Sequence, residues 1–135
     1  MRRAANCSPD RVLASSKIPG SVRITSHVLD VSRGTPAAGI TVRLEHREED
    51  AEDWRLVGTS LTNADGRVSD LSPESAPATA GQYRLTFETH QYFAAQAIST
   101  LYPAVIIVID AAAGESHYHV PLLLSPFGYT TYRGS

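Results

Sequence analysis

The alternation of apolar and polar residues in short segments is the feature that most constrains the fold. In residues 117–124 every second position is apolar: Tyr118, Val120, Leu122 and Leu124 alternate with His117, His119, Pro121 and Leu123. Successive side chains of a β-strand point to opposite faces of a sheet, so the first four side chains share a face suited to a core. Residues 21–30, 40–46 and 82–88 repeat the same period, which is typical of strands that bury one face.

The remaining segments complete an all-β pattern. We expect further strands over residues 54–61, 67–68 and 129–132, and the continuous apolar run of 104–110 predicts a buried central strand. Turn-forming residues occupy 63–66 and 125–128. The one helical candidate is 89–97, which Thr89 could cap. About eight short strands at this spacing predict a β-sandwich.

The length predicts one domain, and the lack of periodicity in residues 1–20 indicates a flexible extension before it. A chain of 135 residues buries about two thirds of its unfolded surface. Its net charge of −2 creates no strong field, and its longest apolar run is too short to cross a bilayer. We therefore expect neither a nucleic-acid nor a membrane partner. The single cysteine, Cys7, excludes an internal disulfide and a thiolate metal cluster.

Histidines are the main candidates for chemistry. Of the five in the chain, His27 and His119 lie on the non-core faces of their predicted strands, and His117 shares the face of His119. We expect His46 and His90 at the surface. A histidine on an open strand face is more often an ordinary surface residue than a catalyst. The alternatives are a general base at neutral pH and a zinc site made by His117, His119 and His27.

Three further residues draw attention through their positions. Arg67 follows a turn, where a solvated arginine is the ordinary interpretation. Tyr132 and Ser135 lie in a terminal segment, where disorder is the ordinary interpretation. Ser135 as a nucleophile is disfavoured, because no acidic partner for an orienting triad is apparent.

Four separated motifs, in this order, resemble the transthyretin-like 5-hydroxyisourate hydrolases. They are Ser-His-Val-Leu-Asp at 26–30, Thr-Asn-Ala-Asp-Gly-Arg-Val at 62–68, His-Tyr-His-Val-Pro-Leu-Leu-Leu-Ser-Pro at 117–126 and Tyr-Arg-Gly-Ser at 132–135. The resemblance covers residues 21–135. It implies an all-β, transthyretin-like sandwich of two four-stranded sheets with one short helix. It also implies a homotetramer, arranged as a dimer of dimers with a channel between the dimers.

The resemblance implies a function as well. Members hydrolyse 5-hydroxyisourate to 2-oxo-4-hydroxy-4-carboxy-5-ureidoimidazoline in urate degradation, with no metal and no cofactor. By motif position, His27 and His119 would activate water and Arg67 would hold the substrate. Tyr132 and Ser135 would complete the binding site, with Ser135 positioning substrate or water. His117 would have a supporting role.

Two rival functions and the compartment stay open at the level of sequence. Transthyretin is a carrier with the same fold, and fold does not determine function. The carrier lacks the Tyr-Arg-Gly-Ser ending and the combination of His27, Arg67 and His119. The other rival is a metal hydrolase built on the three histidines. The ending is not a peroxisomal tripeptide, so we expect a cytoplasmic protein, with the peroxisome as the alternative.

Overall fold

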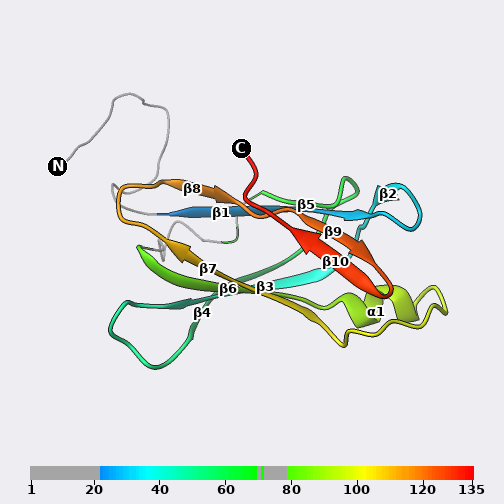
Figure 1. Cartoon of the computed structure of the whole chain (residues 1–135), viewed down its shortest axis with the longest axis horizontal. Helices are drawn as coiled ribbons and strands as arrows, with labels where there is room; N and C mark the ends of the chain where they lie inside the picture. Colours follow the sequence, from blue (N-terminus) through cyan, green and yellow to red (C-terminus); the bar gives the residue numbers. More distant parts are fainter. Residues whose placement is uncertain (1–21, 70, 72–78) are drawn as a thin grey trace.

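Two β-sheets stacked face to face, with one short helix at the end of the stack, make up the protein (Figure 1). The computed structural model describes residues 22–69, 71 and 79–135. The extension expected over residues 1–20 lies outside the described residues. Within the described part, the two sheets and the single helix confirm the predicted all-β sandwich of the transthyretin type.

The first sheet is antiparallel and has four strands in the order β4-β3-β6-β7. Their bounds are β4 Arg55–Leu61, β3 Thr41–Arg47, β6 Gly81–Phe87 and β7 Val105–Ala111. The prediction of a buried central strand at 104–110 was wrong, because β7 lies at the edge of this sheet. Ile106 and Val108 point outward and are exposed, while Val105 and Ile107 face the core. A continuous β-branched run carries no period from which a one-sided edge strand could be recognised.

The second sheet is built around β1 (Arg23–Asp30). The short strands β2 (Thr35–Pro36) and β5 (Arg67–Val68) pair antiparallel with β1. The strands β8 (His117–His119) and β9 (Leu122–Ser125) pair parallel with it, and β10 (Gly128–Thr131) closes the sheet against β9. The single strand predicted over 117–124 is therefore interrupted around Pro121, whose nitrogen has no hydrogen to donate. The sheet thus has six strands. The short β2 and β5 follow each other along one edge of β1, and β8 and β9 follow each other along the opposite edge, so the six strands occupy the four expected positions.

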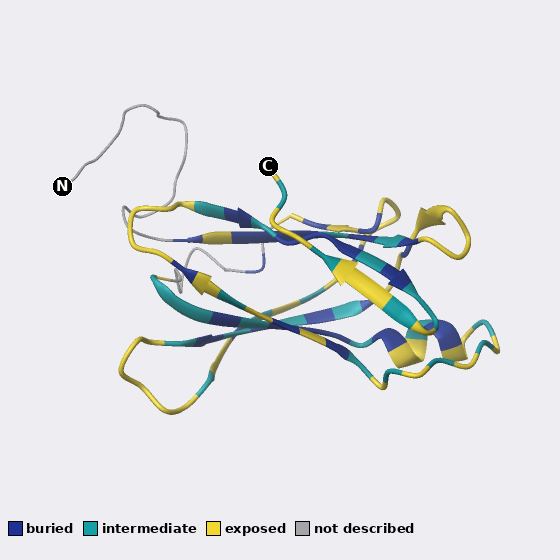
Figure 2. Cartoon of the chain, viewed as in Figure 1, coloured by how far each residue is buried: buried dark blue, intermediate teal, exposed yellow. Residues whose placement is uncertain are grey.

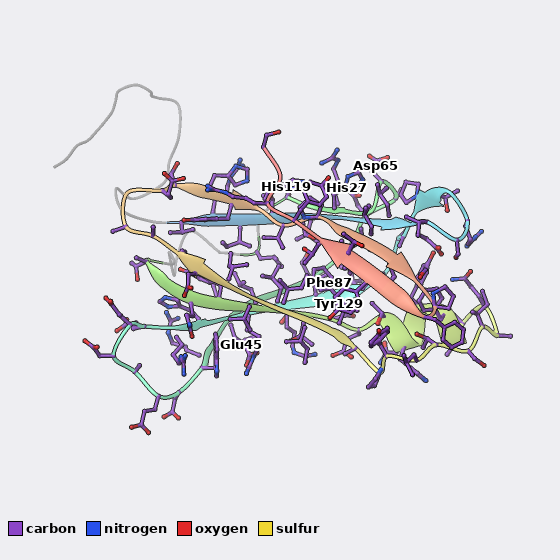
Figure 3. The ribbon with its side chains drawn as sticks, in the orientation of Figure 1. His27, Glu45, Asp65, Phe87, His119 and Tyr129 are labelled. Carbon is purple, nitrogen blue, oxygen red and sulfur yellow. The ribbon has the colours of Figure 1, made fainter. Side chains whose placement is uncertain are left out.

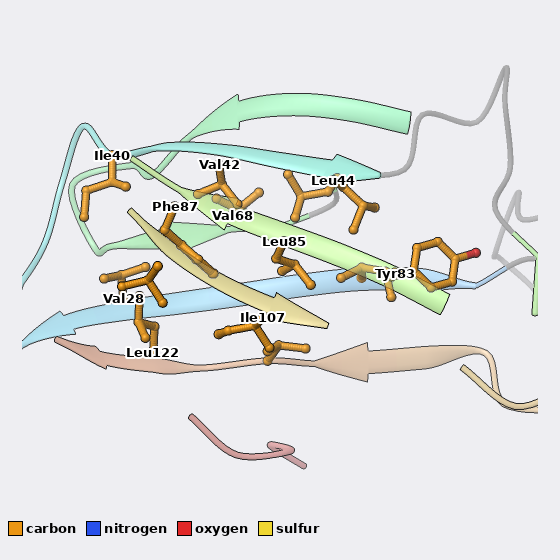
Figure 4. Packing of buried hydrophobic residues seen from close by; sticks show 14 of the residues in the cluster. Val28, Ile40, Val42, Leu44, Val68, Tyr83, Leu85, Phe87, Ile107 and Leu122 are labelled. Atoms are coloured by element: carbon orange, nitrogen blue, oxygen red, sulfur yellow. The ribbon is translucent and has the colours of Figure 1, made fainter. Parts of the chain in front are cut away.

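The hydrophobic core fills the space between the two sheets (Figures 2 and 4). The alternations predicted over 21–30 and 117–124 are confirmed: Ile24 and Val28 of β1 are fully buried, as are Leu122 and Leu124 of β9. From the other sheet come Val42, Leu44, Tyr83, Leu85 and Phe87. Burying a side chain of this size contributes roughly 1.5–3 kcal/mol, so the core fixes which face of each strand points out.

Helix α1 (Thr89–Ala94) is shorter than the predicted 89–97. Thr89 is not its cap: Glu88 holds the N-cap position, and the buried hydroxyl of Thr89 has no hydrogen-bond partner among the described residues. The helix depends on Phe93, which is fully buried. No helix in the described part of the chain is long and apolar enough to span a membrane.

His46 does not lie at the surface, as the sequence had led us to expect. Only 1% of it is exposed, and its ring stacks on Tyr83 with the centroids 4.5 Å apart. Its Nε2 lies 3.2 Å from the carbonyl of Ala80, and Arg55 reaches its Nδ1 at 3.3 Å. The alternation of β3 places residues 42, 44 and 46 on one face, so this burial follows from the strand period. His90 is exposed as predicted.

Candidate active site

The outer face of β1 is the platform of the candidate site. Ile24, Ser26 and Val28 of this strand point into the core, so Thr25 and His27 point away from it. On one side β1 pairs with β5, which sets His27 opposite Arg67. On the other side it pairs with β8, which sets Thr25 opposite His119. Three side chains that are 40 to 92 positions apart in the sequence are thus held on three adjacent strands.

The turn before Arg67 is fixed by Asn63 and Gly66. The side-chain oxygen of Asn63 accepts hydrogen bonds from the backbone N–H of Asp65 at 2.9 Å and of Arg67 at 3.0 Å. Gly66 has a φ of +77°, and an added Cβ there would lie 2.3 Å from the carbonyl oxygen of Val28. Only glycine combines that conformation with so close an approach. The turn therefore docks directly onto β1 and delivers Arg67 beside His27.

His27 and Arg67 are both accessible from outside. The Nε2 of His27 lies 2.9 Å from the backbone carbonyl of Asp65. A carbonyl can only accept a hydrogen bond, so Nε2 carries the proton and, in the neutral ring, Nδ1 keeps its lone pair. Arg67 is exposed, and no acidic side chain among the described residues pairs with its guanidinium. Figure 3 shows His27 and His119 near each other on the outer side of the sheet.

His119 is the most constrained of these side chains. Its Nδ1 lies 2.7 Å from the hydroxyl of Thr25, which leaves Nε2 to meet substrate or water. Partial burial lowers the pKa of His119 below 6.5, and the positive charges that His117, Arg67 and His27 can carry lower it further. His119 is therefore neutral at pH 7, the form in which an imidazole can accept a proton.

The segment after β10 folds back over His119. The backbone N–H of Gly134 donates to the carbonyl of His119 at 2.8 Å. An added Cβ at Gly134 would lie 2.4 Å from Cδ2 of the His119 ring and 3.2 Å from Pro121. The backbone at Gly134 is therefore close to the Cδ2 side of the imidazole, while Nδ1 faces Thr25.

Arg133 anchors this segment, a role that the sequence did not indicate. Its guanidinium pairs with Glu115 at 2.8 Å, donates to the carbonyl of His117 at 3.3 Å and lies 4.3 Å above the ring of Tyr118. The first contact is exposed and worth little alone, but the three together hold the tail on β8. No local pattern in the sequence could reveal partners 15 to 18 positions away.

Tyr132 and Ser135 differ from the other predicted residues in their placement. Tyr132 is exposed and lines a cavity of about 450 Å³ between the tail and β7, together with Ile107 and Val108. None of His27, His117 and His119 lines this cavity. Ser135 follows Gly134 directly and is exposed. Roles for both in substrate binding stay predictions.

A metal site would require the three histidines to converge. Instead His117 and His119 both direct a ring nitrogen at the hydroxyl of Thr25, and His27 directs Nε2 at a carbonyl. Among the described residues, no three or more of His, Cys, Asp and Glu are grouped as a metal would need. The donor set suits proton transfer better than coordination.

Comparison with known proteins places these residues in a family context. The chain is 42% identical to the 5-hydroxyisourate hydrolase of Salmonella typhi over 86% of this chain and 83% of that one. It is also 42% identical to the mouse 5-hydroxyisourate hydrolase, over 83% of this chain and 94% of that one. The solved structure of the Klebsiella pneumoniae 5-hydroxyisourate hydrolase matches with a TM-score of 0.72 and 38% identity, covering 84% and 99% of the two chains.

A protein solved with bound thyroxine has the same fold. Sea bream transthyretin, solved in complex with thyroxine, matches with a TM-score of 0.74 and 33% identity over 82% of this chain and 93% of that one. Backbone similarity therefore does not separate the two kinds of protein. A family model described as the HIUase/Transthyretin family matches residues 24–134, which include His27, Arg67, His119 and Gly134. The chain belongs to the HIUase/Transthyretin family.

Proposed function

We propose that this protein hydrolyses 5-hydroxyisourate to 2-oxo-4-hydroxy-4-carboxy-5-ureidoimidazoline, a step of urate degradation. The observation that carries the proposal is the assembly of His27, Arg67 and His119 on three adjacent strands, where partial burial lowers the pKa of His119. The relatives named 5-hydroxyisourate hydrolase, at about 40% identity over most of the chain, support the substrate.

In this proposal His119 is the general base. Its Nε2 takes one proton from a water molecule as the water oxygen attacks a ring carbonyl of the substrate. A base near neutral pH contributes typically 10²- to 10⁴-fold to the rate. That is a suitable magnitude for a substrate that also decays without an enzyme. A lowered pKa keeps the base unprotonated before the reaction, and the proton that it gains is then readily passed on.

Arg67 and His27 complete the chemistry. The guanidinium of Arg67 offers a planar fork of N–H donors that fits neighbouring carbonyl oxygens and offsets the negative charge that develops on the attacked oxygen. His27 presents Nδ1 toward the site as an acceptor that orients the water. The tetrahedral intermediate collapses by breaking the ring amide C–N bond. The imidazolium of His119 returns its proton to the departing nitrogen, so the base is regenerated and a carboxylate and a ureido group are formed.

A carrier of the transthyretin kind is the alternative that an experiment must separate. We would follow the ultraviolet absorbance of 5-hydroxyisourate, made in situ from urate and urate oxidase, with and without the protein. Decay faster than the spontaneous rate, insensitive to a chelator and lost in His119→Ala, is the expected result. Decay at the spontaneous rate would refute the hydrolase and direct attention to ligand binding.

The site also favours assembly of several chains. His27, Arg67 and His119 lie on an outer sheet face, so one chain alone leaves the substrate open to solvent. Tyr129 and Tyr132 near the β10 edge and Ile106 and Val108 on β7 are exposed apolar side chains on which another copy could pack. We propose a homotetramer arranged as a dimer of dimers. Light scattering should give a mass of about four times the 14.6 kDa of one chain.

A further inference from the structure

The hydroxyl of Thr25 lies between two histidine rings. It is 2.7 Å from Nδ1 of His119 and 2.9 Å from Nε2 of His117. Thr25 is nearly buried, and β1 and β8 hold all three residues in fixed register. The mechanism described above uses His119 but assigns no work to Thr25 or to His117.

The number of hydrogens limits how these three groups can bond. A hydroxyl has one hydrogen to donate, so it cannot donate to both rings. If it donates to His119, then Nδ1 of His119 has no proton and the neutral ring carries its proton on Nε2. If it donates to His117, then Nδ1–H of His119 donates to the hydroxyl, and Nε2 of His119 keeps a lone pair.

Only the second arrangement suits a base that works through Nε2. The Nε2 atom is also the only ring nitrogen of His119 that can reach a substrate, because Nδ1 is occupied by Thr25. Turning the ring over would place Cδ2 opposite Thr25 in place of Nδ1 and would lose this hydrogen bond. The proton position therefore has to be set by the partner of Nδ1, as is usual for functional histidines.

We propose that Thr25 is a positioning residue that selects the Nδ1–H tautomer of His119, with Nε2 of His117 accepting the hydrogen of the Thr25 hydroxyl. The direction is His119 Nδ1–H to Thr25 Oγ1, then Thr25 Oγ1–H to His117 Nε2. This inference rests on the proposed general-base role of His119. In this arrangement the Nε2 of His117 accepts a hydrogen bond, so the neutral ring of His117 carries its proton on Nδ1.

Nitrogen-15 NMR of histidine-labelled protein at pH 8 tests the tautomer without any substrate. Spectra of His119→Gln and His117→Gln would assign the two rings. We expect His119 to be protonated at Nδ1 and not at Nε2 in the wild type and in Thr25→Ser, which keeps the hydroxyl. In Thr25→Val, which keeps the shape but not the hydroxyl, the Nε2–H tautomer should become populated. A wild-type His119 protonated at Nε2 would overturn the proposal.

Turnover gives the second readout. Thr25→Val should lower kcat by about 10- to 100-fold, less than the ~10⁴-fold cost of a wrong tautomer in serine-protease triads, because the ring of the variant still exchanges tautomers. Thr25→Ser should keep most of the wild-type kcat. Thr100→Val is the matched control, since the Thr100 hydroxyl also makes two hydrogen bonds, to Pro126 at 2.6 Å and from Tyr102 at 3.3 Å, outside the site. Unchanged kcat in Thr25→Val would also overturn the proposal.

The two readouts separate this inference from the proposed function. If the wild type does not accelerate substrate decay but His119 is protonated at Nδ1, the hydrolase proposal fails and the tautomer assignment stands. If the wild type is active and His119 is protonated at Nε2, the hydrolase proposal stands and the role of Thr25 is refuted.

Discussion

Replacing Gly134 with alanine should disable His119 without unfolding the protein. A Cβ at this position would lie 2.4 Å from Cδ2 of His119, whereas carbon atoms in contact prefer about 3.5–4.0 Å. Ring and tail must therefore separate by roughly 1 Å. A displacement of that size in a catalytic group can cost about 10²-fold in rate. We expect kcat to fall by about that factor.

The fold should tolerate the same change. The backbone of Gly134 does not have a positive φ, so alanine can adopt its conformation, and the tail is partly exposed. We expect the free energy of unfolding to change by less than about 1 kcal/mol, as is usual for changes outside the core. Denaturant unfolding and steady-state kinetics on one preparation would measure both quantities.

Gly128→Ala is the matched control for this prediction. Gly128 also lacks a positive φ, and the nearest atom to its added Cβ is Oγ of Ser125 at 3.7 Å, an ordinary contact. This variant should keep wild-type kcat. Full turnover in Gly134→Ala would refute the reasoning, because it would mean that the close contact between the tail and His119 does not position the ring.

Three further predictions follow from the site and its surroundings. Activity should fall as the pH drops through the lowered pKa of His119, below 6.5. Arg67→Ala removes a positive charge, so it should raise that pKa and move the acidic side of the pH–rate profile to higher pH. Arg67→Lys keeps the charge, so it should leave the profile unchanged but raise KM. His46→Ala should cost about 2–4 kcal/mol in denaturant unfolding, since it removes a buried stacked ring, whereas exposed His90→Ala should change little. Dialysis against a chelator should leave turnover unchanged; a stoichiometric metal whose removal abolishes activity would contradict the metal-free mechanism.

Much of the fold was predictable because strand alternation is a local property. The inward faces of β1 and β9 follow from residue spacing alone, and the core confirms them. The burial of His46 could have been predicted from the same alternation, but the charged residues that follow it in the sequence favoured a surface position. The edge position of β7 could not be predicted, since the sequence does not show which strands lie beside it.

The site was predictable only in part. His27, Arg67 and His119 stand in motifs that a family resemblance marks, so they could be named. Thr25 could not, because a threonine in a strand is ordinary and its partner His119 lies 94 positions away. Arg133 was noticed within a motif, yet its anchoring role depends on Glu115 and Tyr118, which only the folded chain brings together.

The parallel pairing of β1 with β8 has a consequence for synthesis. The ribosome makes β1 first among the described strands, but the segment that pairs with it follows some 90 residues later. One edge of β1 therefore stays unpaired during most of translation, when exposed strand edges promote aggregation. A chain interrupted before residue 117 would retain both sheets' earlier strands but neither His119 nor its tail. Such a chain therefore lacks the proposed general base, however much of the sandwich has formed.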